Sequence, residues 1–488
     1  MSEQSGVQVV VRLRPMSERE LKGNTLPVVT ASTEKKEVTV IKGSGARTLR
    51  STFAFDDVFT SFSTQKEVFD QTLAPVIGDV LNGYESTVFA YGQTGTGKTH
   101  TMEGDLNVSE DRGVIPRAAF DVFRRLRADD AYVEFDVSAS FLEIYNEELC
   151  DLLVDCDFED LAAVKAKSKE LRLVEDPVGA GKKKGRGVFV MGLTEEPVRS
   201  PEDVLTLMAR ASERRRVGET KMNKQSSRSH CVFTMSVRSR RALPDGSHME
   251  CAGKLHMVDL AGSECAKSAG GGDLDQARER ERKNINQSLL TLGRVITLLK
   301  NGGKAKGERI PYRDSKLTRL LQESLGGRCK TCVIATVSPS AMSADETLST
   351  LQYAQGAHGI VNKPVAASML KLNVEGAGRP QTARGDGTNP GMTGQTQQDW
   401  AEMETRMHYL ETQAEEAAAA LARKHAEHAA LVSRAETAEG KVDAAEKAAL
   451  LAEAQRAATL EQLEDATAEN ERLGALLAAR VRTEEALT

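Results

Sequence analysis

Short apolar runs alternate with segments of helical periodicity over the larger, N-terminal part of the chain, from about Val7 to Val361. The apolar runs are rich in β-branched and aromatic residues, which favour strands. They are VQVVVRLR, STVFAY, FDVSASFLEIY, CVFTMSVRSR, KLHMVDLAG and TCVIATVSP. Because several of them are apolar at consecutive positions, the strands are expected to be buried on both faces. The pattern predicts an α/β fold in which a central mixed, mostly parallel sheet is flanked by helices.

A different pattern follows this region. Residues 374–399 are rich in Gly, Thr, Gln, Asn and Pro, which bury too little apolar surface to fold alone, so a flexible linker is predicted there. Residues 400–488 contain no Pro and are dominated by Ala, Glu, Leu, Arg and Lys, a composition typical of a long helix. A heptad register begins with Met403, Met407, Leu410, Ala414, Ala417 and Leu421.

These heptads predict an α-helical coiled coil over residues 400–488, through which the protein would form a homo-oligomer. Lys424, His428 and Arg456 interrupt the apolar seam. The many alanines in core positions would also bury little area. A solvated single helix therefore stays open as the alternative.

Composition and charge narrow the classes of protein. The chain has 488 residues, of which 40% are hydrophobic and 28% charged, and a net charge of −6. This excludes a generic nucleic-acid binder, so any acidic partner must meet a local basic patch. The apolar stretches are too short for membrane insertion and no secretory signal is visible, which predicts a cytoplasmic protein.

The cysteines support the same location. Seven are scattered along the chain, which argues against a disulfide framework. The closest pair, Cys329 and Cys332, opens an apolar run, and no second pair or histidine cluster completes a metal site. We interpret this pair as the entry to a strand.

A phosphate-loop motif follows the predicted strand STVFAY. It consists of Gly92, Gln93, Thr94, Gly95, Thr96, Gly97, Lys98 and Thr99. The glycines let backbone amides turn inward around a triphosphate, Lys98 supplies positive charge, and the Thr99 hydroxyl is a candidate magnesium ligand. The motif alone leaves GTPases, ATPases and small-molecule kinases open.

Two later segments carry candidate sensors of the third phosphate. Asp259 ends a predicted strand, where its carboxylate would hold magnesium through water, and the Gly262 amide could approach the γ-phosphate. In the other segment, the hydroxyls of Ser226 and Ser227 could reach the metal ion and the attacking water. Arg228 and Glu264 form an opposite-charge pair between the segments.

The chain resembles the kinesin motor domain from about Val7 to Val365, because five long motifs occur in the order typical of that family. They are FAYGQTGTGKTHTMEG, EIYNEELCDLL, SSRSH, DLAGSE and NINQSLLTLGRVI. The resemblance implies a phosphate-loop nucleotidase fold that binds ATP and Mg²⁺ and hydrolyses ATP during movement along microtubules. Residues 1–360 would form the motor domain and residues 361–373 the neck linker.

The resemblance also assigns roles around the nucleotide. Arg12, Arg14, Pro15 and His100 would flank the adenine. Residues 226–230 and 259–264 match the two switch segments, which would close over the γ-phosphate through the Arg228–Glu264 pair. Catalysis would then rest on positioning and charge stabilisation without a covalent intermediate.

A basic surface is expected to meet the acidic microtubule. The resemblance implicates the segment IPYRDSKLTRLL, and the basic residues before the switch-linked helix and a lysine-rich hairpin tip are added candidates. The residues are Lys182, Lys183, Lys184, Arg282, Lys283, Tyr312, Arg313, Lys316 and Arg319. Each cluster would otherwise be interpreted as an ordinary solvated face.

The helix of residues 284–300 is expected to relay changes at the phosphate to the microtubule-facing surface. Its apolar stripe lets it slide as a rigid unit against the core. The segment VNKPV resembles the kinesin neck linker. Fewer than ten residues precede the first strand, so we predict plus-end movement. The motifs look closest to BimC-type mitotic kinesins, which implies a place in the spindle or in transport. Three features depart from that pattern: the loop GDLNVSEDRG is short, the loop from Cys265 to Lys283 is longer, and AQGAHGIVN lacks the usual basic run.

Two alternatives belong to other classes. One is a non-motile microtubule-binding ATPase that regulates microtubule organisation or dynamics, against which the intact Lys98, Asp259 and Glu264 argue. The other is a phosphate-loop enzyme acting on a soluble substrate, for which no substrate-specific segment is visible.

Overall fold

The fold is taken from a computed structural model of the chain. It describes residues 5–23, 25–43, 48–156, 160–176, 187–222, 226–243, 247–264, 276–302 and 307–371. The predicted flexible linker and coiled coil lie outside these residues, as does the lysine-rich tip at Lys182–Lys184. None of the described helices is both long enough and apolar enough to span a membrane.

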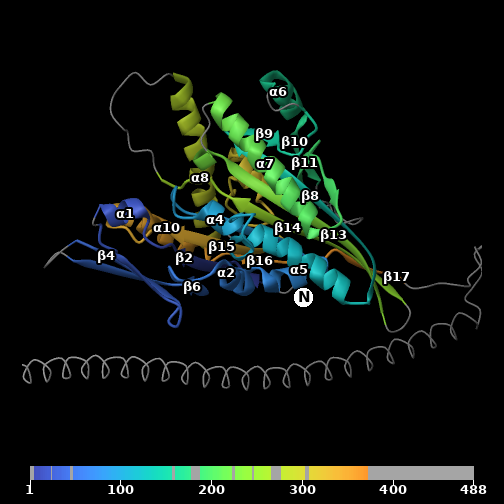
Figure 1. Ribbon diagram of the computed structural model, residues 1–488, viewed down its shortest axis with the longest axis horizontal. Coiled ribbons are helices and arrows are strands. Elements are labelled where there is room, and N and C mark those ends of the chain that lie inside the picture. The colour runs from blue at the N-terminus through green and yellow to red at the C-terminus, as the bar shows by residue number, and fades with distance from the viewer. Residues whose placement is uncertain are drawn as a thin grey trace, which may run out of the picture. The chain divides into compact units, whose positions relative to one another are not determined.

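A mixed sheet forms the centre of the region up to residue 371 (Figure 1). Its strands run in the order β12-β8-β13-β14-β7-β15-β2-β6, with β9 added to β8 and β17 to β14. Their bounds are β2 Gln8–Leu13, β6 Asp57–Phe59, β7 Glu85–Tyr91, β8 Tyr132–Tyr145, β9 Glu148–Asp151, β12 Glu196–Val198, β13 His230–Ala242, β14 His248–Asp259, β15 Lys330–Val337 and β17 Ser368–Lys371.

The mixed sheet flanked by helices is confirmed, but "mostly parallel" was too strong. Parallel pairing covers only the half from β14 through β7, β15 and β2 to β6. The other half, from β12 to β14, is antiparallel. The reason is that β13 and β14 form a long hairpin, and strands joined by a hairpin must run in opposite directions.

Helices cover both faces of the sheet, and each face has its own hydrophobic core. One core contains side chains from α2 (Gln65–Thr72), α3 (Ala74–Leu81), α5 (Val114–Ala128) and α7 (Pro201–Met222). The other contains side chains from α8 (Gln276–Lys300), α9 (Lys316–Leu320) and α10 (Ala344–Ala357). Along β2, Val10 enters the first core while Val9 and Val11 enter the second. This alternation explains why the strands are apolar at consecutive positions.

Smaller elements sit around this frame. A three-stranded sheet comprises β3 (Val29–Ser32), β4 (Glu37–Lys42) and β5 (Leu49–Ala54), and α1 spans Glu18–Lys22. Beside the antiparallel half lie α6 (Leu161–Glu170) and the pair β10 (Arg172–Asp176) and β11 (Gly187–Met191). The phosphate-loop helix α4 covers Lys98–Met102. Cys329 and Cys332 are buried at the start of β15, where a strand was predicted.

The segment that was predicted to be the neck linker lies along the core in its described part. Its first strand β16 (Val361–Asn362) pairs with β1 (Ser5–Gly6), and β17 pairs antiparallel with β14. In β16, the buried Asn362 side chain donates to the carbonyl oxygens of Ser324 and Cys329 at 2.9 and 2.7 Å and accepts from the Gly326 amide at 2.7 Å. Backbone pairing and this one amide therefore hold the segment in place.

Candidate nucleotide site

The phosphate loop is placed by the central parallel strands. β7 runs between β14 and β15 and leads into residues 92–97, after which α4 begins at Lys98. Gly95 and Gly97 have φ of 80° and 96°, in the left-handed region that favours glycine. At Gly92 a Cβ atom would lie 2.2 Å from the Thr336 carbonyl oxygen. The glycines are thus required by the path of the loop against β15.

Lys98 is held by the loop that it follows. Its Nζ donates to the carbonyl oxygens of Gly92 at 2.9 Å and Gln93 at 3.1 Å, and the residue is 7% exposed. Burial lowers the pKa of Lys98, while the nearby carboxylates of Asp259 and Glu264 oppose that shift. The ammonium group is therefore held beside the phosphate loop. A bound phosphate could replace the two carbonyl oxygens as its hydrogen-bond partner.

Thr99 and Asp259 form a pair of oxygen donors beside Lys98. The Thr99 hydroxyl donates to Asp259 Oδ2 at 2.5 Å. The other oxygen, Oδ1, is buried and has no hydrogen-bond partner among the described residues. Burial raises the pKa of Asp259, against the opposing effects of the Thr99 hydrogen bond and the Lys98 charge. A buried carboxylate oxygen without a partner, next to a hydroxyl, fits the coordination chemistry of Mg²⁺.

The predicted switch I (residues 226–230) and switch II (residues 259–264) contact each other, and switch II also contacts the phosphate loop. The Gly262 amide donates to the Ser227 carbonyl oxygen at 2.8 Å, which joins one switch to the other, and the Ser263 amide donates to the Gly92 carbonyl oxygen at 3.1 Å. A Cβ atom on Gly262 would lie 2.3 Å from Thr94 Oγ1 and about as close to the Glu264 carboxylate, so a larger residue would displace these two side chains. The Gly262 amide was predicted to approach the γ-phosphate, and in this conformation it is bonded to Ser227 instead.

Glu264 also has a partner that the sequence did not predict. Its Oε2 accepts from the Thr94 amide at 2.8 Å, and its Oε1 accepts from the Thr94 hydroxyl. The predicted Arg228–Glu264 pair stays a prediction. Ser226 and Ser227 lie in a short 3-10 helix with Arg228, but the Ser226 side chain is outside the described set.

The residues predicted to flank the adenine divide into internal and exposed groups. Arg12 is buried and donates to Gln65 Oε1 at 2.7 Å and Thr101 Oγ1 at 2.9 Å. Arg14 donates to the Gly95 carbonyl oxygen at 2.8 Å and makes two bonds to Glu20, which lower the pKa of Glu20 to about 2. Arg14 thus contacts the phosphate loop at Gly95, and Arg12 contacts the helix that follows the loop at Thr101. Pro15 and His100 are the more accessible pair.

Residues 226–230, the predicted switch I, follow α7 in the chain, and a buried ion pair anchors that helix. Arg215 of α7 donates to Glu103 Oε1 at 3.2 Å, and Glu103 directly follows α4. Burial raises the pKa of Glu103, and the guanidinium of Arg215 opposes this shift. The helix that carries switch I and the helix that follows the phosphate loop are therefore tied together in the core.

His230 connects the switches to α8, a role that the sequence did not reveal. Its Nδ1 accepts from the Ala261 amide at 3.0 Å, and its Nε2 lies 2.9 Å from the Ser288 hydroxyl of α8. Burial, aided by the Lys98 charge, lowers the pKa of His230 to about 3, so the ring is neutral near pH 7. The signal was present, since His230 closes SSRSH and Ser288 lies in NINQSLL, but only the fold brings the two motifs together.

The predicted microtubule-facing residues are only partly brought together. Arg313, Lys316 and Arg319 lie on or next to α9, and they border a depression of about 340 Å³ together with Arg172. Tyr312 is a correction, because it is buried and its hydroxyl donates to the Leu325 carbonyl oxygen at 2.6 Å, so it supports this surface from within. Arg282 and Lys283 belong to α8, but their side chains lie outside the described set.

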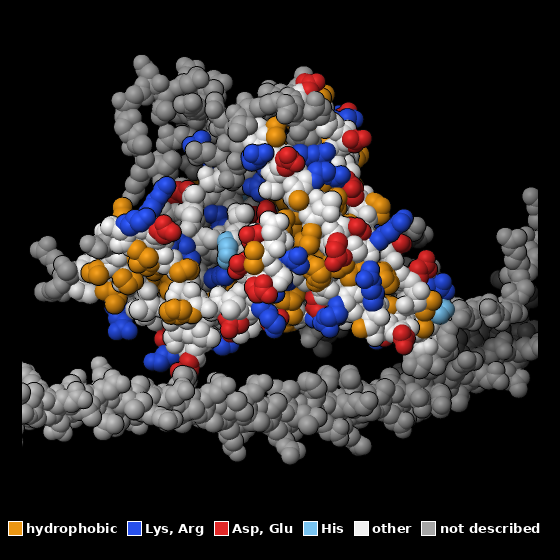
Figure 2. Space-filling view, viewed as in Figure 1, with side chains coloured by type: hydrophobic (Ala, Val, Ile, Leu, Met, Phe, Trp, Pro, Cys, Tyr) orange, Lys and Arg blue, Asp and Glu red, His pale blue; other side chains and the backbone are white. Residues whose placement is uncertain are grey.

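The surface charge is mixed. Figure 2 shows Lys and Arg side chains interspersed with Asp and Glu over the visible face, without a single-sign field. This agrees with the net charge of −6. Recognition of an acidic polymer would therefore depend on a local set of cations.

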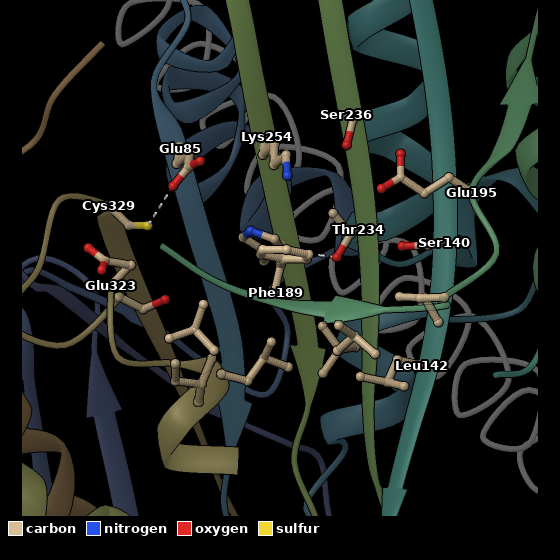
Figure 3. Close-up of a pocket in the computed structure, with 18 residues that line it drawn as sticks. Glu85, Ser140, Leu142, Phe189, Glu195, Thr234, Ser236, Lys254, Glu323 and Cys329 are labelled. Atoms are coloured by element: carbon tan, nitrogen blue, oxygen red, sulfur yellow. Dashed lines mark hydrogen bonds between the residues drawn. The ribbon is translucent and has the colours of Figure 1, made fainter. Parts of the chain in front are cut away.

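A separate cavity of about 110 Å³ lies beneath β11, away from the phosphate loop (Figure 3). Glu85, Lys254 and Glu195 form its polar part, and Leu142 contributes to its apolar part. On its floor, His256 Nδ1 lies 2.9 Å from the Thr234 hydroxyl, and burial lowers the pKa of His256 to about 4. The cavity also borders the end of α9, at Leu320 and Leu321.

A phosphate loop at the end of a central parallel strand, an acidic residue beside the loop threonine, and a following segment that contacts the loop define a phosphate-loop nucleotidase. A family model described as the kinesin motor domain matches residues 12–360. The chain therefore belongs to the kinesin motor domain family.

The relatives agree with this family. The chain is 46% identical over 376 residues to "Kinesin-like protein KIN-5C" of Arabidopsis thaliana, covering 75% of this chain and 36% of the relative. It is also 46% identical over 373 residues to "Kinesin-like protein KIN-5A" of the same plant, covering 75% and 34%. The chain thus spans about a third of these relatives' length. These names agree with the resemblance to BimC-type kinesins.

A solved structure supports the same fold. It is described as "Structure of a fast kinesin: Implications for ATPase mechanism and interactions with microtubules". The match has a TM-score of 0.64 and 37% identity and covers 78% of this chain and 97% of that one.

Proposed function

We propose that this protein is a microtubule motor that couples ATP hydrolysis to movement, as a microtubule-stimulated ATPase. The observation that carries the proposal is that switch II contacts both the phosphate loop and switch I. Gly262 is bonded to Ser227, and Glu264 to Thr94. A triphosphate entering here must displace or remake these contacts, so the conformation of both switches depends on the third phosphate.

Mg²⁺ and ATP fit the donors of the site. Thr99 and Asp259 are the candidate metal ligands, with Ser227 as a third. When bound, the ion neutralises charge on the phosphate oxygens. Lys98 would contact the outer phosphates, Gly262 would offer its amide to the γ-phosphate, and the hydroxyls of Ser226 and Ser227 would orient the attacking water.

Two connections support the coupling of this pocket to distant surfaces. His230 joins switch II at Ala261 to α8 at Ser288. The neck-linker segment 361–371 pairs with β1 and β14. A shift of α8 on phosphate loss would change the surface around α9 and the part of the core against which the neck-linker segment packs.

The track-facing set in this proposal is Arg313, Lys316 and Arg319. The names of the relatives support a kinesin-5 type of motor. Plus-end movement, a location on cytoplasmic or spindle microtubules, and homo-oligomerisation through residues 400–488 are parts of the same proposal. The paired neck-linker segment favours it over a non-motile ATPase, which would need no such lever.

The test has two stages. Microtubule pelleting is measured with a non-hydrolysable ATP analogue, with ADP and without nucleotide, alongside ATP turnover with and without microtubules. We expect tight pelleting in the ATP-like and empty states, weak pelleting in ADP, and stimulated turnover. Equal affinity in all three states would refute the proposal. Gliding of polarity-marked microtubules then gives the direction, and minus-end movement would overturn that part.

A further inference from the structure

A two-residue turn between β8 and β9 has an unusual backbone. Asn146 and Glu147 both have positive φ, of 51° and 61°, and the flanking Tyr145 and Glu148 are paired across the hairpin. Two central residues with positive φ are typical of the tight hairpin turn in which asparagine is favoured first and glycine second. Glutamate at the second position is therefore strained, and a glycine would relieve it.

The Glu147 side chain explains why a strained residue is useful there. Its Oε2 accepts from the Lys316 amide at 2.7 Å, and its Oε1 accepts from the Ser315 hydroxyl at 3.0 Å. Lys316 is the first residue of α9 and Ser315 is its N-cap. The carboxylate thus binds an amide that has no partner within the helix, at the end where negative charge is favourable.

The helix needs an external anchor. α9 has 5 residues, far fewer than a helix needs to be stable alone. Leu317 and Thr318 of α9 are fully buried and Leu321 is 2% exposed, so these side chains hold the helix against the core. Leu320 and Leu321 also border the cavity of Figure 3. The two bonds to Glu147 fix the N-terminal end of α9, where Lys316 lies.

We propose that Glu147 is a positioning residue for the microtubule-facing surface, holding α9 so that Arg313, Lys316 and Arg319 keep their mutual spacing. The inference rests on the proposed function and deepens it. Glu147 borders the same depression as these cations. Among the described residues, its carboxylate bonds to Ser315 and to the Lys316 amide, and no ion pair with the three cations is seen.

The sign of the effect separates positioning from simple electrostatics. Removing an acidic residue near an acidic polymer reduces repulsion and should strengthen binding. Removing an anchor that orients three cations should weaken binding. The adjacent Glu148 is exposed and serves as the matched control, because it has the same charge and no bond to α9 in the described structure.

The experiment compares Glu147→Ala, Glu147→Gly, Glu147→Gln and Glu148→Ala with the wild type. Microtubule affinity is measured by pelleting with a non-hydrolysable ATP analogue, the Michaelis constant for microtubules by ATPase titration, and folding by thermal unfolding. We expect Glu147→Ala to bind about five- to tenfold more weakly, as two lost hydrogen bonds imply. Basal turnover without microtubules should not change.

The other variants separate the side chain from the backbone. Glycine removes the anchor but relieves the strained φ, so Glu147→Gly should bind as weakly as Glu147→Ala while unfolding at an equal or higher temperature. Glutamine can still accept from the Lys316 amide and bond Ser315, so Glu147→Gln should keep most of the affinity. Glu148→Ala should bind equally or slightly more tightly.

Two results would overturn the inference in different ways. If the wild type binds microtubules and Glu147→Ala binds as tightly or more tightly, Glu147 is not a positioning residue and the motor proposal stands. If the wild type binds microtubules in no nucleotide state, the proposed function fails and the role of Glu147 fails with it.

Discussion

The nucleotide site and the track-facing surface are built in opposite ways. The nucleotide site joins three stretches of sequence through short bonds in a mostly buried place, with Lys98 and Asp259 both less than a tenth exposed. The track-facing surface carries more accessible cations: Lys316 and Arg319 lie on the 5-residue helix α9, and Arg313, in the turn before it, has a side chain that is 65% exposed. In the nucleotide site, the functional groups are positioned by hydrogen bonds to one another. On the track-facing surface, the cations are positioned by other residues, such as Glu147 and Tyr312.

This difference predicts how each region responds to substitution. A change in the nucleotide site removes a group that takes part in the chemistry, so large losses of turnover are expected. A change on the track-facing surface removes one of several exposed charges, so losses of a few fold are expected.

Lys98→Ala should reduce ATP turnover by at least about a hundredfold, because the loop loses the only charge that it directs at the phosphates among its own residues 92–99. Steady-state ATPase and binding of a fluorescent nucleotide check this. The control is Lys22→Ala, at an exposed lysine of α1 that should leave turnover unchanged. Near-normal turnover of Lys98→Ala would contradict the expectation that substitutions in the nucleotide site have large effects.

Glu264→Ala should bind nucleotide but fail to hydrolyse it, with a loss of at least about tenfold, because the latch over the γ-phosphate cannot close. Single-turnover hydrolysis and nucleotide binding are the measurements. Since Glu264 contacts Thr94 in this structure, Thr94→Ala tests the other explanation. If Thr94→Ala shows the same defect and Arg228→Ala does not, the latch is wrong and the Thr94 contact is what matters.

Acid should destabilise the fold through His230, which links the two regions. Its pKa is about 3 when folded and about 6.5 when unfolded, so the unfolded state binds more protons between these values and stability falls as pH drops below about 6.5. At pH 5 the loss from this residue is about 2 kcal/mol. Denaturant unfolding from pH 7.5 to 5 measures it.

A His230→Gln variant is the control for that titration. The amide can replace the hydrogen bonds but cannot take up the proton, so the variant should lose less stability between pH 7.5 and 5 than the wild type does. His256, which is also buried with a lowered pKa, titrates in both proteins and cancels in the difference. Identical slopes would exclude His230 as a source of the acid sensitivity.

Arg313→Ala should weaken microtubule binding by only about two- to fivefold. Arg313 already lies 2.8 Å from a Glu175 carboxylate oxygen, so part of its charge is neutralised before tubulin arrives. Glu175→Gln releases that charge and should strengthen binding by a similar factor. Pelleting at two salt concentrations measures both, and a Glu175→Gln variant that binds more weakly would contradict this account of the surface.

Much of the nucleotide site could be predicted from sequence, because its residues belong to local motifs whose backbone geometry follows from glycine content and spacing. The phosphate loop and the two switch segments were located in this way, and the structure brings them together. The partners within the site could not be predicted. Glu264 contacts Thr94 across 170 positions of sequence, and the amide of Gly262 is bonded to Ser227.

The fold shows the same limit. Apolar runs predicted strands buried on both faces, and the alternation of Val9 and Val10 between two cores agrees with that prediction. The excess of parallel pairing was predicted wrongly, because periodicity identifies a strand but not the direction of its neighbour. Tyr312 was placed on the surface by its motif, while the fold buries its ring and directs its hydroxyl to Leu325.

The sequence by itself determined the class of fold, the phosphate loop, the switch segments and the kinesin family, since all of these are encoded in short stretches whose spacing has a direct geometric meaning. Only the tertiary structure decided which distant groups touch: His230 with Ser288, Glu147 with the first turn of α9, and Asn362 with the loop before β15. The physical reason is that a hydrogen bond depends on atoms within about 3 Å, and residues far apart in the chain reach that distance only through packing of the whole core.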